Sequence, residues 1–241
     1  MTRAPLKVLT YVAFPMVATV AGGLAASARP MSPRVRSGVQ HFAAGVVFAA
    51  IAGELLPDVL HGKAPLQAVL GFILGVAVMF GVKRLTERLS PAEDARAGLQ
   101  LGLITAVGID ALLDGLVIGI GYAAGARQGA LVAVALTLEM LFLGLASAAT
   151  LKARGTRSAS IFALLFIMAI LLAVGALVGA TVLSGLPGRD LTGVLAFGTA
   201  TLLYLVTEEL LVSAHEVEET PLVTVSFFVG FLVVLIVELL L

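Results

Sequence analysis

Cysteine is missing from this 241-residue chain, and charged residues are scarce. Without cysteine there are no disulfides, thiolate metal sites or cysteine nucleophiles. Only 12% of the residues are charged while 60% are hydrophobic, and the mean hydropathy is +1.10. A soluble domain of this composition could not cover its core with polar surface. We therefore expect the lipid bilayer to be the solvent for most of the chain, and the zero formal net charge gives no reason to expect a nucleic-acid partner.

Long apolar runs divide the chain into eight segments, each of about the 20 residues that cross a bilayer as a helix. The runs do not alternate as barrel strands do, so we predict α-helices. The first run, which ends in Ala-Ser-Ala at 26–28, also fits a secretory signal, but its length favours a span. The sequence thus predicts one all-α integral membrane domain, with spans at 6–28, 38–60, 64–82, 98–123, 129–151, 160–183, 191–214 and 221–241.

Lysine and arginine are unevenly divided between the two sides of the predicted membrane. Loops on the side of the termini contain five of these residues, and loops on the other side contain ten. Because cytoplasmic loops carry the excess of Lys and Arg, the second side is predicted to be cytoplasmic. Both termini then lie outside the cytoplasm, and the cell (inner) membrane is the expected location.

An internal repeat relates the first three spans to the last three. "FAAGVVFAAIAGELL" (42–56) aligns with "FGTATLLYLVTEELL" (197–211) at an offset of 155, which pairs Glu54 with Glu209. The same offset pairs "GFILG" (71–75) with "SFFVG" (226–230) and the first span with the sixth. Partners are an odd number of spans apart, so the repeats are predicted to be inverted, as in secondary transporters, in a 3+2+3 arrangement. Chance similarity between apolar helices is the alternative.

Three acidic residues lie inside the two middle spans. Asp110 and Asp114 are one helical turn apart in the fourth span and share one face, and Glu139 lies in the fifth span. The short linker makes these spans antiparallel neighbours and gives Asp114 and Glu139 a similar depth. We predict that the three carboxylates converge on a divalent cation. Protonated carboxylates that merely link helices, or a proton relay, are the alternatives.

Acidic residues also occur in the second and seventh spans. The repeat pairs Glu54 with Glu209, and we predict gating or pathway roles for both, one from each half. Glu208 is adjacent to Glu209 and points about 100° away from it on a helix. Only one of the two can therefore face a shared cavity fully, and the repeat selects Glu209.

Histidines are few, and two of them lie near ends of predicted spans. His41 begins the second span and is expected at the membrane interface rather than as a ligand. His215 and Glu216 open the acidic stretch "HEVEET" on the predicted cytoplasmic side. If a metal ion leaves on that side, these two residues are candidate receiving groups.

Glycines recur at four-residue spacing in three places, at 115 and 119, 121 and 125, and 175 and 179. Small residues at this spacing let helix backbones approach closely in membranes. We expect close helix–helix contacts there.

Enzyme signatures are missing. The chain has no nucleophile elbow, phosphate-binding loop or H-E-x-x-H motif. Asp110 and Asp114 lie on one helix, whereas a membrane aspartyl-protease dyad brings two carboxyl groups together across the site. We therefore expect a protein that is not an enzyme.

The full pattern resembles the ZIP (Zrt/Irt-like) divalent metal transporters. "HFAAGVVFAAIAGELLPDVL" resembles the second span of that family and "FGTATLLYLVTEELL" its seventh. "DALLDGLVIGIGYAAG" resembles the fourth-span motif H-N-x-P-E-G with its small-residue tail, and "EMLFLGLASAATL" resembles the fifth-span motif H-E-x-P-E-G. The resemblance implies eight spans, outside termini, a metal site between spans four and five, and a homodimer.

The metal ligands of the family are altered here. Its first span-four histidine aligns with Asp110, its glutamate with Asp114, and its first span-five histidine with Glu139. The last span-five glutamate aligns with Leu143, and the acid often found in span six has no counterpart, so the two-metal centre of the family is incomplete. One all-oxygen site remains, which suits Mn²⁺ or Mg²⁺, with Fe²⁺ also possible, better than Zn²⁺. The rival functions are proton-driven transport of another cargo on the same carboxylates and a non-transporting sensor or scaffold.

Overall fold

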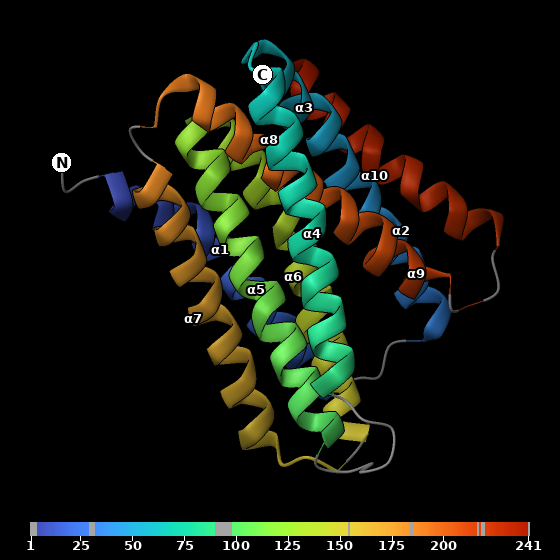
Figure 1. Cartoon of the computed structure of the whole chain (residues 1–241). Coiled ribbons are helices and arrows are strands. Elements are labelled where there is room, and N and C mark those ends of the chain that lie inside the picture. The colour runs from blue at the N-terminus through green and yellow to red at the C-terminus, as the bar shows by residue number, and fades with distance from the viewer. Residues whose placement is uncertain are drawn as a thin grey trace.

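The computed structural model describes residues 4–28, 32–89, 98–153, 155–183, 186–215, 217 and 220–240, and within these ranges it contains helices and turns but no strand. Eight helical stretches of the described chain are long and apolar enough to cross a membrane (Figure 1). The prediction of eight spans is confirmed, with ends that differ by a few residues. The chain is therefore an all-α protein with the features of an integral membrane protein.

Six of the eight spans are single uninterrupted α-helices: α1 (Ala4–Ala28), α4 (Pro65–Leu89), α5 (Gly98–Ala124), α6 (Ala126–Ala153), α7 (Ser158–Leu183) and α10 (Pro221–Leu240). The second span consists of α2 (Pro33–Ala50), the π segment η1 (Ile51–Leu55) and α3 (Leu56–His61). The seventh consists of α8 (Gly188–Leu205), the π segment η2 (Val206–Leu210) and α9 (Leu211–Ala214). Spans two and seven thus share one construction.

Each π segment closes with a backbone bond across five residues. The Leu56 N–H donates to the Ile51 carbonyl, and the Leu211 N–H donates to the Val206 carbonyl. The segments begin 155 residues apart, the offset of the sequence alignment. A π turn holds one extra residue and so rotates the following side chains relative to an α-helix; such turns are frequent at functional sites. The acidic residues of both spans lie in these segments.

One group of helices consists of α1, α5, α6 and α7. In it α5 packs along α7, and α1 packs along α6 and α7. A Cβ added at Gly115 would come within 2.0 Å of the Leu172 carbonyl oxygen, and one added at Gly175 within 2.1 Å of that of Leu112. Only glycine permits this reciprocal approach of α5 and α7, so the expected close contact is confirmed there. We call this group the first bundle.

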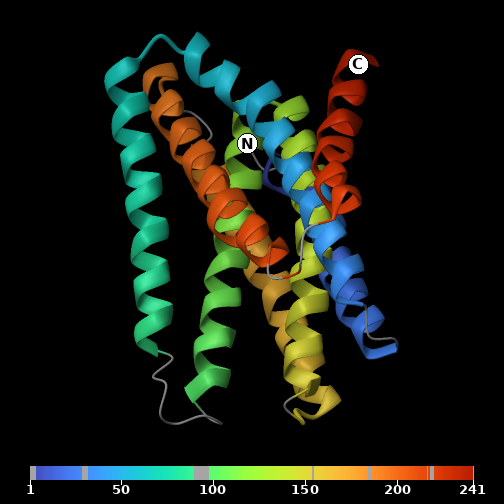
Figure 2. The same ribbon diagram turned by 90° about the vertical axis from the view of Figure 1, so that its right-hand side faces the viewer.

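The other group, the second bundle, contains α2–α3, α4, α8–α9 and α10. Its closest pairs are α10 with α2 and α4 with α8, and Figure 2 shows them side by side. Gly75 lies against the Phe197 carbonyl, and Gly230 lies against the Phe42 carbonyl. Both the glycines and the phenylalanines are 155 residues apart. The two helix pairs therefore meet through corresponding residues.

Three helix boundaries bear on the sequence predictions. The buried Val8 and Val12 join α1 to the core, which favours a span over a secretory signal. Helix α4 continues beyond the predicted end of its span, so Lys83 lies in a helix rather than in a linker. Likewise Arg127 lies in the first turn of α6. Lys and Arg are good helix formers, and their long side chains reach from helix ends toward polar surroundings. This explains why α4 includes Lys83 and why α6 includes Arg127.

Candidate metal site

Asp110 and Asp114 on α5 meet Glu139 on α6. Each residue offers one carboxylate oxygen, and these three oxygens lie within 4.8 Å of one another. The helical spacing puts both aspartates on one face of α5, and the connection through Gly125 folds α6 back beside it. The predicted convergence of the three carboxylates is confirmed. We call these three residues the triad.

Two residues of the triad, Asp114 and Glu139, are buried among apolar side chains, and Asp110 is partly buried. Asp114 is completely inaccessible, and Glu139 is 4% exposed. Within the described residues, neither oxygen of Asp114 has a hydrogen-bond partner, and the Oε2 of Glu139 has none either. An ionised carboxylate in such surroundings costs several kcal/mol unless a counter-charge accompanies it. A bound divalent cation supplies that charge, and carboxylate oxygens are the ligands that hard dications prefer.

A cavity of about 220 Å³ leads from the triad toward one end of the molecule. Asp110 lines its inner part. Lys83 and Glu208, which are both about half exposed, line its outer part. The cavity therefore connects the triad with the surface at the end where α4 terminates.

A second cavity of about 140 Å³ also has Asp110 in its wall, together with Gln40 and Glu139. Asp110, Leu143 and Glu209 line both cavities. Glu209 thus borders both spaces, and its predicted pathway role stays a prediction. Leu143, at the position where the ZIP motif has a glutamate, supplies only apolar surface.

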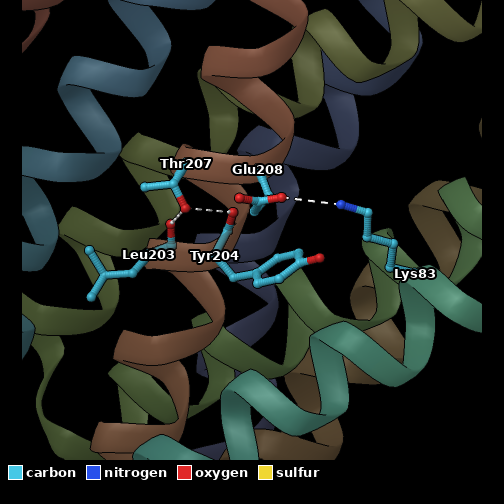
Figure 3. A network of polar contacts seen from close by, with 5 residues as sticks. All are labelled: Lys83, Leu203, Tyr204, Thr207 and Glu208. Carbon is cyan, nitrogen blue, oxygen red and sulfur yellow. Dashed lines mark hydrogen bonds and ion pairs between the residues drawn. The ribbon is translucent and has the colours of Figure 1, made fainter.

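Glu208 forms an ion pair with Lys83 of α4. The Lys83 Nζ lies 3.1 Å from the Glu208 Oε2 (Figure 3). Beside it, the Thr207 hydroxyl donates to the carbonyls of Leu203 at 2.9 Å and Tyr204 at 3.3 Å, which belong to the last turn of α8. Neighbouring glutamates in η2 therefore have different environments, Glu208 beside a lysine and Glu209 between the cavities.

Toward the opposite end, the triad is covered by tightly packed apolar side chains. Ile118 of α5, Leu136 of α6 and Leu202 of α8 lie on that side and are fully buried. Interiors packed in this way leave no path for a hydrated ion. The triad is thus reached from one end and closed from the other.

Glu54 lies beyond this apolar layer and lines neither of the two triad cavities. Its Oε1 is 3.1 Å from the Arg127 Nε, and its side chain is 9% exposed. The Glu238 carboxylate packs against the neighbouring Gly53. The predicted pathway role of Glu54 stays a prediction. Sequence reasoning missed its arginine partner because Arg127 was assigned to a linker.

The histidines at the open end lie together. The rings of His41 and His215 are 4.9 Å apart, and the Ser37 hydroxyl donates to the Ala214 carbonyl at 2.6 Å between the same helices. His41 is buried because α9 packs on the start of α2, and its predicted place at the membrane interface stays a prediction. His215 lies beside the second helix, and Glu216 lies outside the described residues.

Comparison with models of known protein families gives no match, and no curated protein matches the chain either. The resemblance to the ZIP family therefore stays a prediction from the motifs. The triad, its cavities and the packing around them are therefore the observations that bear on function.

Proposed function

We propose that this chain is a transporter that moves a divalent metal cation across a membrane through the triad of Asp110, Asp114 and Glu139. The observation that supports this most strongly is a buried group of carboxylates, open to one end of an eight-span chain and sealed from the other. Ionisable groups at mid-span are rare and normally mark the path of a substrate or a proton. A site open to one end at a time is the requirement for alternating access.

The proposal includes an inverted-repeat, ZIP-like architecture. Its support is the 155-residue offset shared by the sequence alignment, the π segments and the contacts of Gly75 and Gly230. A second correspondence joins the middle spans: Gly115 meets Leu172, and Gly144 meets Thr19. Gly115 and Gly144 are 29 residues apart, as are Asp110 and Glu139. The symmetry then includes spans four and five, which the sequence alignment had left unpaired.

Movement of one bundle against the other is the transport step in this proposal. The three triad residues all belong to the first bundle, whereas Glu209 belongs to the second. A shift between the bundles would therefore open the triad to the other end of the molecule while its three residues stay together. In this proposal the open end is the predicted cytoplasmic side, and the arrangement is the inward-open one.

The ligand chemistry favours hard ions. With oxygen ligands alone, Mn²⁺ and Mg²⁺ fit better than Zn²⁺, and Fe²⁺ is intermediate. The resemblance to the ZIP family supports a homodimer in the cell (inner) membrane with both termini outside the cytoplasm.

Uptake into proteoliposomes tests the proposal. The purified chain should accelerate entry of at least one of Mn²⁺, Mg²⁺, Fe²⁺ and Zn²⁺ above the rate of empty liposomes. The Asp110→Ala, Asp114→Ala double variant should lose this uptake, and Glu87→Gln, a change at an exposed residue of α4, should keep it. If no divalent ion enters faster than in empty liposomes, the proposal is wrong.

The same preparation separates the rival functions. A transporter that uses the carboxylates only for protons should show pH-driven proton flux without any metal. A sensor or scaffold should show neither flux. If metal still enters with the Asp110→Ala, Asp114→Ala variant, the chain is a metal transporter but the triad is not its metal site.

A further inference from the structure

A groove of about 340 Å³ lies between the two bundles, near the end of the molecule where α4 begins. Helices α4 and α8 of the second bundle and α5 of the first form its walls (Figure 1). No residue of the triad lines it, and it lies at the opposite end of α4 from Lys83 and the mouth of the larger triad cavity. We call it the interbundle groove.

The interbundle groove is apolar and opens sideways, toward the surroundings of the helices. Leu70 and Leu74 of α4 line it and are each 57% exposed. Along α4 it extends from Gln67 to Leu74, and seven residues of an α-helix rise about 10 Å. Because the hydrocarbon core of a bilayer is about 30 Å thick, this length fits within one leaflet. In a membrane, an acyl chain of that leaflet is the apolar group that reaches the groove directly.

Polar groups gather at the end of the groove nearest the start of α8. Gln67 and Asp190 are the polar residues of its wall, and Asp190 is exposed and has no ion-pair partner within the described ranges. Arg189, also exposed, precedes it in the first turn of α8. The exposed Lys63 is close by, because the neighbouring Gly62 packs against the side chain of Thr192. One acid and two bases therefore surround the polar end of an apolar groove.

We infer that the interbundle groove binds a phospholipid whose headgroup carries a primary amine, as phosphatidylethanolamine does. One acyl chain lies in the groove, the ammonium group donates to the Asp190 carboxylate, and the phosphate lies beside Arg189 and Lys63. Charge-assisted hydrogen bonds of this kind are the strong ones, and basic groups between transmembrane helices recognise lipid headgroups. A phosphatidylglycerol headgroup has a phosphate but no ammonium group for Asp190.

This inference goes beyond the proposed function, since it holds whether or not the triad carries a metal ion. Its structural consequence follows from the origin of the walls. Because α5 belongs to one bundle and α4 and α8 to the other, the bound lipid contacts both bundles at once.

A second groove, on another face of α4, supplies an internal comparison. It has a volume of about 270 Å³, is formed by α3, α4 and α8, and has no charged residue in its described wall. Val69 lines this groove and is 55% exposed, whereas the adjacent Leu70 lines the interbundle groove and is 57% exposed. Two neighbouring positions at one depth in the membrane therefore report on two grooves that differ in charge.

Quenching of tryptophan fluorescence by brominated lipids tests the inference. The chain contains no tryptophan, so Leu70→Trp and Val69→Trp each introduce a single reporter. Each full-length variant is reconstituted into the same mixture of phosphatidylethanolamine and phosphatidylglycerol, with bromine on the acyl chains of one lipid at a time. Quenching then measures how often that lipid lies beside the reporter.

Two further changes, made in the Leu70→Trp chain, locate the headgroup contact. Asp190→Asn removes the negative charge that receives the ammonium group. Asp58→Asn makes the same chemical change in α3, at an acid that lines neither groove, and is the matched control.

At Leu70→Trp, brominated phosphatidylethanolamine should quench at least about twofold more strongly than brominated phosphatidylglycerol, as expected for one partly exposed ion pair. The two lipids should quench Val69→Trp equally. Asp190→Asn should abolish the difference at Leu70→Trp, and Asp58→Asn should keep it.

Three results would overturn the inference. Equal quenching at Leu70→Trp by both lipids would show ordinary, unselective lipid contact. A preference that persists in Asp190→Asn would place the headgroup contact elsewhere. Weaker quenching at Leu70→Trp than at Val69→Trp by both lipids would show that protein, such as a second copy of the chain, covers the groove. None of these results involves a metal ion, so each would leave the proposed function standing, and failure of metal uptake would leave this inference standing.

Discussion

At the scale of single residues, the molecule is organised around acids that destabilise it in the absence of a counter-charge. Asp114 is the clearest case, because it is fully buried and neither of its oxygens has a hydrogen-bond partner among the described residues. Folding does not need this carboxylate, and a neutral side chain of the same shape would avoid the desolvation cost. In the proposed function a bound cation accounts for its presence, at the expense of stability.

Substitution Asp114→Asn should therefore separate stability from function. Without metal, the variant should melt a few degrees higher than the unmodified chain, because a buried unpaired charge is gone. With Mn²⁺ at about 100 times its dissociation constant, the unmodified chain should gain about 2.7 kcal/mol, while the variant should gain almost nothing. Thermal unfolding in detergent with and without Mn²⁺ measures both effects. Glu87→Gln, at an exposed position, should behave like the unmodified chain; an equal metal response in Asp114→Asn would contradict the assignment.

Sequence reasoning found the triad because helical spacing and a short linker fix those three positions. Gln40 and Arg127 were missed for physical reasons. The face of α2 that carries Gln40 becomes interior only when α6 and η2 pack against α2. Arg127 was read as a loop residue, although α6 begins one residue before it. A glutamine inside an apolar span was the one signal in the sequence that pointed to Gln40.

At the scale of helices, the two π segments decide which side chains of spans two and seven face the interior. Glu209 lines both cavities, while the preceding Glu208 pairs with Lys83. The sequence predicted the spans themselves, since bilayer thickness sets their length. It did not predict the π turns, because an i→i+5 bond has no residue signature and depends on what packs around the helix.

The neighbouring glutamates of η2 should consequently respond differently to the same substitution. Glu209→Gln should reduce metal uptake at least about tenfold, since loss of a polar group beside the metal ligands typically costs about 10–100-fold. Glu208→Gln removes only a half-exposed ion pair and should change uptake no more than about twofold. Initial uptake rates at matched protein incorporation give the comparison. Equal losses in the two variants would show that the direction of the side chain in η2 does not matter.

Close contact between α5 and α7 gives a second prediction at this scale. A Cβ at Gly115 would lie within 2.0 Å of the Leu172 carbonyl oxygen, whereas a Cβ at Gly81 of α4 has no atom within 4 Å. Gly115→Ala should thus force the helices apart and cost about 1–3 kcal/mol. Gly81→Ala should cost nothing, because alanine is the better helix former. Unfolding in detergent measures both, and a Gly115→Ala chain as stable as the Gly81→Ala chain would contradict this packing.

At the scale of the whole molecule, the two bundles meet around the triad. Arg127 and Glu54 join them on the closed side, because α6 belongs to the first bundle and η1 to the second. The predicted repeat divides the chain into spans one to three and six to eight, whereas each bundle contains spans from both groups. It could not give the pairing of α10 with α2 and of α4 with α8, since contacts between distant spans arise only when the bundles assemble.

Removal of the Arg127 side chain should loosen the closed side. The substitution Arg127→Ala leaves the buried Glu54 carboxylate without its partner and removes a contact between bundles. Because the chain contains no cysteine, a single Ala50→Cys change places one reporter thiol among the buried residues below Glu54. Labelling of that thiol by a membrane-impermeant maleimide should increase several-fold. Arg189→Ala, at an exposed arginine of α8, is the matched control, and unchanged labelling in Arg127→Ala would show that the ion pair does not hold this side closed.

The most direct test of the central claim is the initial rate of Mn²⁺ uptake into proteoliposomes containing either the unmodified chain or Asp114→Asn at equal incorporation. Divalent cation transport through the triad predicts saturable uptake by the unmodified chain. It predicts that the variant falls to the rate of empty liposomes while remaining folded, as its unfolding transition shows. Uptake by Asp114→Asn at the unmodified rate would contradict the account.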